Sequence, residues 1–231
     1  MSTYLQLTAQ LRQLATDSGT GPTAVTGNTG ELARFVAWIA DYYTELQNEK
    51  DDWLWLRKSF TVNTVVGTGE YAYISCTDTA TSAAIARFSN WYKNSFTAYL
   101  SSGGVGGEYE LKWMDWDAFK RKYRFGALTN GVPRHVSMEP TREFALGPKP
   151  SAVYVVSGDY KSGPQVLAAD ADEPEMPAEF HKLIVYGALL KYGFHRAAPE
   201  ALQLAQTSGA SLRFALERNQ LPPIRAGVSL A

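Results

Sequence analysis

The spacing of apolar residues changes twice along this 231-residue chain, and those changes restrict the folds open to it. Near the start, Tyr4, Leu7, Leu11 and Leu14 recur at intervals of three and four, which predicts an amphipathic helix ending at about Thr16. A longer stripe predicts a second helix that begins after an N-cap at Thr29 and ends near Glu49. Its members are Leu32, Phe35, Val36, Ile39, Tyr43 and Leu46.

From about Leu56 to Tyr160 the pattern is that of short strands. Phe60, Val62, Thr64 and Val66 alternate with more polar neighbours before a GTGE turn. The further β-prone runs are NSFTAYL, EYELKWM, RHVSM, REFAL and SAVYVVSGDY, and the turn sequences between them are SGGVGGE, NGVP and GPKP. Asp115–Tyr123 predicts one short helix, because its acidic start and basic end suit the helix dipole.

The helical period returns after Asp170. Pro177 suits the first position of a helix that ends near Gly193, and Pro199 suits the first position of another. We therefore predict an α+β fold: a four-helix bundle built from both chain ends with an inserted antiparallel β subdomain and an extended C-terminal arm. The expected bounds are 1–55 plus 164–220 for the bundle, 56–163 for the β subdomain and 221–231 for the arm.

The amino-acid composition limits the classes of protein to which the chain can belong. Hydrophobic residues make up 45% of the chain and can form a packed core. The 22 Lys and Arg residues against 23 Asp and Glu argue against a dedicated nucleic-acid binder, while leaving room for a local basic patch. The single cysteine, Cys76, cannot form an intramolecular disulfide. We expect neither a secretory signal nor a membrane helix, which needs about 20 apolar residues.

The glycine-rich stretch SGTGPTAVTGNTGELARFVAWIADYY, from Ser18 to Tyr43, has the layout of a phosphate-binding loop but not its chemistry. Gly30 is followed by Glu31, and no lysine occurs before Lys50, so the Walker pattern is absent. A helix rather than a strand precedes the glycines, unlike a dinucleotide fold. We therefore interpret the stretch as a connection between two helices, and we expect no cofactor.

A metal site is not expected either. Of the three histidines, His135 lies in a β segment, and His181 and His195 are fourteen residues apart and could share a helix face. No third ligand is spaced with that pair, and Cys76 is distant in sequence. The acidic run AADADEPE lacks the glycine and the later glutamate of a calcium loop. We interpret its acids as residues that precede a helix N-terminus; they are Asp170, Asp172, Glu173 and Glu175.

Two further patterns each permit a functional and a structural interpretation. Asp51 and Asp52, beside Trp53 and Trp55, are the candidate carboxylates for glycoside hydrolysis, but an aromatic-packed helix end is favoured. The run FKRKYRF, at 119–125, could contact a nucleic-acid backbone, but the solvated face of a short helix is favoured. Its cations are Lys120, Arg121, Lys122 and Arg124.

The order of these segments resembles that of the adaptor proteins of tailed bacteriophages, the head–tail connector components. The likeness covers most of the chain and is strongest in the first helix pair, in Trp-x-Trp-Leu at Trp53–Leu56, and in Met-Pro-x-x-Phe-His at Met176–His181. The segment Thr61–Gly163 is less diagnostic, although a β insertion there fits.

The resemblance implies a non-enzymatic virion protein at the head–tail junction, made in the host cytoplasm. Such adaptors form homo-oligomeric rings, commonly of twelve copies, between the portal protein and the next tail or collar protein. Packaged double-stranded DNA passes through the channel, and no membrane is involved. The bundle would form the ring wall, and a terminal arm often latches onto the portal. The candidate arm residues are Leu221, Pro222, Pro223, Ile224 and Arg225.

The glycine-rich loop is the candidate subunit interface, and we expect Gly19–Asn28 to become ordered when the ring assembles. Its members are Gly19, Thr20, Gly21, Pro22, Thr23, Gly27 and Asn28. The basic run at Lys120–Arg124 is the candidate DNA-facing surface. The alternatives are a sixfold stopper, gateway or collar protein, a cell-wall hydrolase using Asp51 or Asp52, and a monomeric DNA-binding module.

Overall fold

The computed structural model describes residues 2–15, 21–126 and 128–222, and these residues form the mixed α+β fold that the sequence predicts. They contain five α-helices and two β-sheets. The chain divides into two compact units. The first, Met1–Trp55 with Pro164–Ala231, is called the helical unit below, and the second, Leu56–Gly163, is called the β unit.

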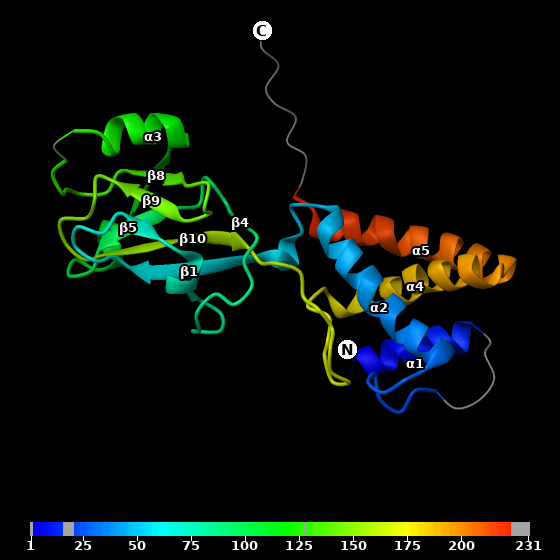
Figure 1. Ribbon diagram of the computed structural model, residues 1–231. Helices are drawn as coiled ribbons and strands as arrows, with labels where there is room; N and C mark the ends of the chain where they lie inside the picture. The colour runs from blue at the N-terminus through cyan, green and yellow to red at the C-terminus, as the bar shows by residue number, and fades with distance from the viewer. Residues whose placement is uncertain (1, 16–20, 127, 223–231) are drawn as a thin grey trace, which may run out of the picture. The chain divides into compact units, whose positions relative to one another are not determined.

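Both ends of the chain contribute to the helical unit. Figure 1 shows α1 (Tyr4–Leu14) and α2 (Gly30–Glu49) beside α4 (His181–Arg196) and α5 (Pro199–Gln220). α4 packs against each of the other three helices, and α1 also packs against α2. The two predicted apolar stripes form the packed faces, since Leu7, Leu11, Phe35 and Ile39 are fully buried.

The helix ends differ in part from the prediction. Thr29 is at the N-cap of α2 as expected, but its side chain makes no capping hydrogen bond. Pro177 does not begin an α-helix; a 3-10 turn (η4, Ala178–Phe180) comes first, and α4 begins at His181. Pro199 does begin α5. Of the expected C-terminal arm, residues 223–231 lie outside the described residues.

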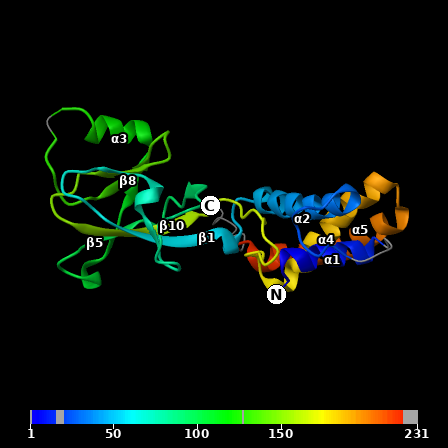
Figure 2. The ribbon, with the colours of Figure 1, turned by 60° about the horizontal axis from the view of Figure 1, so that its bottom comes forward.

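The larger sheet of the β unit is organised around β10 (Tyr154–Lys161). It pairs antiparallel with the whole of β1 (Arg57–Asn63) along one edge, and with β5 (Thr97–Leu100) and β4 (Asn90–Trp91) along the other. β3 (Thr77–Asp78) and β6 (Tyr109–Glu110) complete the sheet. Figure 2 shows β1 and β10 side by side.

The smaller sheet has the order β2, β9, β8, β7 and carries α3 (Trp116–Tyr123). Its strands are β2 (Glu70–Tyr71), β9 (Phe144–Gly147), β8 (His135–Met138) and β7 (Lys112–Trp113). β7 and β8 are parallel, so the prediction of a wholly antiparallel subdomain is wrong at this pair. The reason is that α3 lies between them in the chain, and a helical crossover allows two strands to run in the same direction.

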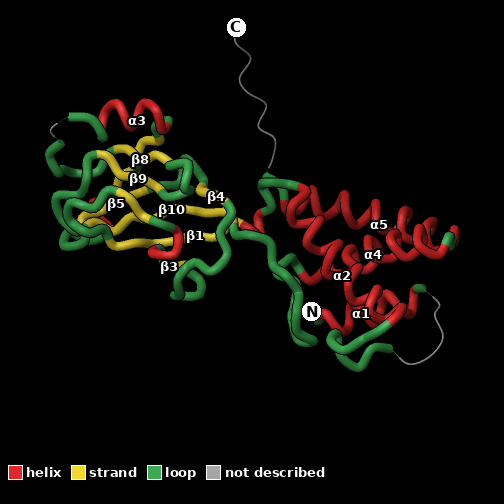
Figure 3. Tube along the Cα trace, in the orientation of Figure 1, coloured by secondary structure: helices red, strands yellow, loops and turns green. Residues whose placement is uncertain are grey.

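Aromatic side chains join the two sheets into one core. Phe60 and Trp91 come from the larger sheet and Phe144 from the smaller, and their rings lie 4.7–5.9 Å apart. Phe60, Val62 and Thr64 are buried as their alternation predicts, whereas Val66 is 52% exposed. In Figure 3 the strands all lie in the β unit, with α3 as the α-helix among them. The smaller sheet and α3 together form the surface described next.

Candidate functional site

The basic helix α3 is attached to the smaller sheet by aromatic side chains. Phe119 is buried at the centre of the helix, and its ring lies 5.8 Å from Trp116 and 5.1 Å from Tyr123. The Tyr123 hydroxyl lies 2.7 Å from Nδ1 of His135 on β8. These contacts fix which face of α3 is turned outward.

The four cations of the candidate DNA-facing surface do not act as one group. Arg124 forms ion pairs with Glu70 and Glu139, and Lys120 pairs with Asp117 at 2.9 Å. Arg121 and Lys122 are exposed. The Lys122 ammonium also lies 5.2 Å from the centre of the Tyr123 ring. Of the four cations, Arg124 therefore contributes most to the attachment of the helix.

Two lysines influence His135, which lies beside α3 on β8. Burial lowers the pKa of His135, and the nearby Lys122 and Lys112 lower it further. Lys112 of β7 and Lys122 of α3 therefore both act on His135 of β8. Lys112 lies in β7, outside the basic run at 119–125, so that run does not reveal its contribution.

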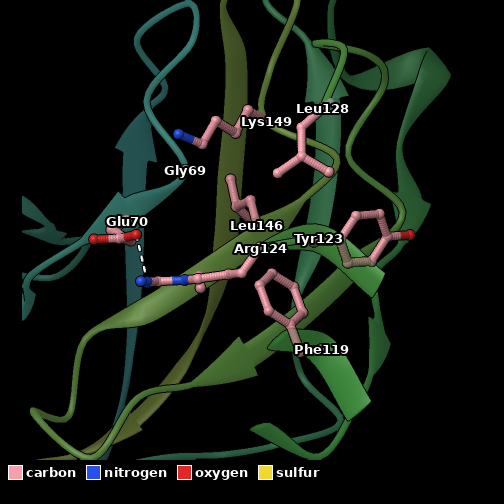
Figure 4. Close-up of a pocket in the computed structure, with 9 residues that line it drawn as sticks. Gly69, Glu70, Phe119, Tyr123, Arg124, Leu128, Leu146 and Lys149 are labelled. Atoms are coloured by element: carbon pink, nitrogen blue, oxygen red, sulfur yellow. Dashed lines mark hydrogen bonds and ion pairs between the residues drawn. The ribbon is translucent and has the colours of Figure 1, made fainter. Parts of the chain in front are cut away.

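A small pocket of about 140 Å³ lies between α3 and the strands β2 and β9. Figure 4 shows the Arg124 guanidinium directed toward Glu70, with the rings of Phe119 and Tyr123 on the other side. Lys149 also lines the pocket. Ligand pockets usually measure about 300–1,000 Å³, so this one is smaller than a typical substrate site.

Three carboxylates meet at the edge of this pocket. Oxygen atoms of Glu70, Glu139 and Glu143 lie within 4.8 Å of one another. Burial raises the pKa of Glu139, and the Glu70 carboxylate raises it further, while Arg124 opposes both. The guanidinium of Arg124 contacts two of the three acids and so offsets part of their negative charge.

The candidate hydrolase residues lie at the end of α2. Asp51 and Asp52 are exposed, whereas Trp53 is 1% exposed and donates its indole N–H to the Leu46 carbonyl at 2.9 Å. The Trp53 and Trp55 rings stack with centroids 4.4 Å apart. The tryptophans thus pack the helix end, in agreement with the structural interpretation of this pattern.

The three histidines lie in three different environments. His181 is buried; its Nδ1 accepts the Ser2 N–H at 3.2 Å, and its Nε2 lies 3.0 Å from the Met176 carbonyl. Nε2 of His195 lies 2.8 Å from a guanidinium nitrogen of Arg34, and His135 contacts Tyr123. The structure therefore brings no two of these histidines together.

Two acids of the run before α4 bind backbone amides, a role that the sequence analysis did not predict. Asp172 accepts the N–H groups of Ala168 and Ala169 at 2.7 and 2.8 Å, and these bonds lower its pKa. Asp170 accepts the Val25 N–H at 2.6 Å. Its carbonyl and that of Asp172 accept N–H groups from the first turn of α1.

The side chain of Gln47 forms two hydrogen bonds with the backbone of Gln165, which the sequence analysis did not predict. Its side-chain oxygen accepts the Gln165 N–H at 2.7 Å, and its amide donates to the Gln165 carbonyl at 2.9 Å. Gln47 is fully buried in α2. A glutamine on the apolar stripe of a helix was the available signal, because a buried amide requires hydrogen-bond partners.

The described part of the candidate interface loop packs on its own subunit. Pro22 and Val25 are buried, and the Asn28 amide donates to the Ala24 carbonyl at 2.7 Å. Thr23 and Gly27 are exposed, and their contact with a neighbouring subunit stays a prediction. Gly19 and Thr20 lie outside the described residues.

The candidate arm is described only at its start. Leu221 is half-buried and Pro222 is exposed, while Pro223, Ile224 and Arg225 lie outside the described residues. Its role in portal binding therefore stays a prediction.

The candidate residues thus lie on helix and loop surfaces that packing and ion pairs hold in place. Residues 2–227 match the family model of the SU10 adaptor protein, so the chain belongs to this family of structural phage proteins. The match spans nearly the whole chain and confirms the resemblance to phage head-to-tail adaptors. A search among curated proteins found no match. None of the helices in the described ranges has the length and apolar character needed to cross a bilayer.

Proposed function

We propose that the protein forms a homo-oligomeric ring, of twelve copies, at the head–tail junction of the virion. In this role it binds the portal protein on one side and the next tail or collar protein on the other, and packaged DNA passes through its channel. The observation that carries the proposal is the family match over residues 2–227.

The helical unit suits the wall of the ring. Its four helices would act as one bundle, because α4 contacts each of the other three. Salt bridges from Lys191 to Glu45 at 2.7 Å and from Arg196 to Glu31 hold α4 against α2. A rigid wall of this kind would let subunits associate without rearranging their cores.

Two further assignments refine the expected surfaces. Arg121 and Lys122 are exposed, whereas Lys120 and Arg124 form ion pairs, so Arg121 and Lys122 are the residues we assign to contact with DNA phosphates. The arm begins at Leu221, directly after α5 in the sequence, and is assigned to the portal.

Cryo-EM of the purified virion tests the proposal. The expected map contains this chain as a twelvefold ring between portal and tail. Density at the distal tail tip would overturn the adaptor role, and a sixfold ring would indicate a stopper or gateway protein instead.

Deletion of residues 221–231 tests the arm separately. The deleted chain should lose binding to the portal protein and keep the circular dichroism spectrum of the full chain. Portal binding equal to that of the full chain would refute this assignment.

A further inference from the structure

A second pocket lies beside the small one, at the C-terminal end of α3, and is called the lysine pocket below. It measures about 210 Å³. Its described lining residues are Lys122, Tyr123, Leu128, Thr129, Pro148 and Lys149. Two of these residues are lysines and none is an acid, whereas the 140 Å³ pocket is lined by Glu70 together with Arg124.

The two lysines of this pocket are not paired with carboxylates. Lys122 and Lys149 are exposed, and neither forms an ion pair with a described residue. Lys122 instead lies over the Tyr123 ring. Glu70 of the adjoining pocket is already paired with Arg124. Because a concave surface that carries charge of one sign concentrates counter-ions, the lysine pocket suits an anion.

Close packing fixes the backbones on the two sides of the pocket. A Cβ atom at Gly147 would lie 2.4 Å from the Tyr123 ring, so the last turn of α3 rests directly on this glycine. The carbonyl of Lys149 accepts the Gly131 N–H at 2.8 Å. Figure 4 shows the Lys149 side chain extended toward Gly69, and its flexible four-carbon stem allows the ammonium to turn toward an anion in the pocket.

Size and hydrogen-bond donors restrict the class of anion. At about 30 Å³ per water molecule, the pocket holds roughly seven waters, which is room for one phosphate group and a few of its waters. It is smaller than the 300–1,000 Å³, roughly, that a whole small-molecule ligand occupies. The Tyr123 hydroxyl is engaged with His135, so the Thr129 hydroxyl is the group beside the lysines that can donate to a phosphate oxygen.

We propose that Lys122, Lys149 and Thr129 together bind one phosphodiester group of double-stranded DNA in the lysine pocket. This inference rests on the proposed function, in which packaged DNA passes through the ring. It adds Lys149, which lies outside the basic run at 119–125, to the contact with DNA. Phosphate contacts carry no base-sequence information, so this site accepts DNA of any sequence.

His135 provides a local measure of phosphate binding. Burial lowers its pKa, and Lys122 lowers it further. A phosphate bound at Lys122 offsets the charge of that lysine and should therefore raise the pKa of His135. His181 and His195 belong to the helical unit and serve as internal controls in the same spectrum.

Histidine-ring NMR of the full chain provides the first test, with a short DNA duplex and inorganic phosphate as separate probes at constant ionic strength. Both probes should raise the pKa of His135 and leave the pKa values of His181 and His195 unchanged. In Lys122→Gln, neither probe should raise the pKa of His135 further. No change of His135 with the duplex would overturn the proposal, and a rise with inorganic phosphate alone would overturn its assignment to DNA.

The salt dependence of duplex binding tests whether the two lysines share one phosphate. Each neutralised phosphate contributes about −0.9 to the slope of log affinity against log salt. The double variant Lys122→Gln with Lys149→Gln should therefore reduce this slope by about 0.9 and weaken binding by about 8-fold at about 0.1 M salt. A reduction of about 1.8 would indicate two separate phosphates and overturn the shared site.

Lys93→Gln with Lys182→Gln is the matched control. It makes the same change of net charge at two exposed lysines outside the pocket and should keep the slope of the unmodified chain. Thermal melts check that both double variants fold. Equal losses in the two double variants would overturn the site, because net charge alone would then explain them.

The outcomes separate the phosphate site from the proposed function. Virions that hold the chain at the head–tail junction, together with unchanged duplex binding in Lys122→Gln with Lys149→Gln, would overturn the site and leave the adaptor role intact. Absence of the chain from that junction would overturn the proposed function and the assignment to packaged DNA, even where the full chain binds duplex DNA in solution.

Discussion

The helical unit and the β unit maintain their structures by different means. In the helical unit, apolar stripes on α1, α2 and α4 form the core, and a polar segment binds it from outside through Gln165, Asp170 and Asp172. In the β unit, aromatic rings from both sheets form one connected cluster around Phe60. The first arrangement depends mainly on periodic local sequence, and the second on contacts between residues far apart in the chain.

This difference teaches where each unit is vulnerable. Loss of one aromatic ring should damage the β unit because the rings of several strands meet there. Loss of one apolar residue from a helix stripe leaves the rest of the stripe in place, so the polar connections are the more informative targets in the helical unit.

The largest effect is expected from Phe60→Ala. Phe60 is fully buried and its ring contacts those of Trp91, Phe96 and Phe144, so the change leaves a cavity between the sheets. We expect a loss of about 3–5 kcal/mol in the free energy of unfolding of the β unit. Hydrogen exchange of peptides from each unit, measured by mass spectrometry in urea, follows the two units separately.

Val65→Ala is the control for this experiment, because Val65 is 60% exposed and should be nearly neutral. Equal loss of protection in both units of Phe60→Ala would show that the units unfold together, and the contrast between them would be wrong.

A smaller effect is expected from Gln47→Leu in the helical unit. The change leaves the N–H and carbonyl groups of Gln165 without their partners, at about 1–3 kcal/mol of unfolding free energy. Protection should fall first in peptides that contain Gln165. Gln203→Leu makes the same chemical change at an exposed position and serves as the control. If it lowers the free energy of unfolding by as much as Gln47→Leu, the paired amide of Gln47 has no special role.

The smallest effect concerns the acid stability of the β unit. Burial of Asp78 raises its pKa, but hydrogen bonds from Tyr160, Thr81 and Ala80 together outweigh it, so the pKa is lowered overall. A lowered folded-state pKa means that the contribution of Asp78 is present above the unfolded value of about 3.9 and is lost as the pH falls below it.

Asp78→Asn should therefore reduce the loss of β-unit stability between pH 6 and pH 3, as measured by urea unfolding at each pH. Asp52→Asn, at an exposed position of the helical unit, should leave this dependence unchanged. An identical acid dependence in Asp78→Asn and the unmodified chain would exclude this role for the carboxylate.

The predicted elements were most accurate where a local period or a local cap carries the information. α1, α2, α3 and α5 begin within one residue of their predicted starts, because helical spacing and N-terminal residues act within one or two turns. α4 begins four residues later than Pro177, because the 3-10 turn of η4 precedes it. The capping box of Thr3 and Gln6 was also readable in the sequence and was missed.

The candidate site was less predictable, because residues far away in the sequence decide which of its cations form ion pairs. Lys120, Arg121, Lys122 and Arg124 are alike in the sequence, yet Arg124 is paired because Glu70 and Glu139 arrive from β2 and the end of β8.

The order of helices at both chain ends around a β region follows from the sequence alone, since periods of 3.6 and 2 are properties of neighbouring residues. Tertiary structure decided which strands pair, that β7 and β8 run parallel, and which cations face solvent. Those outcomes depend on contacts between residues tens of positions apart. A local sequence pattern does not specify which of these distant residues come into contact.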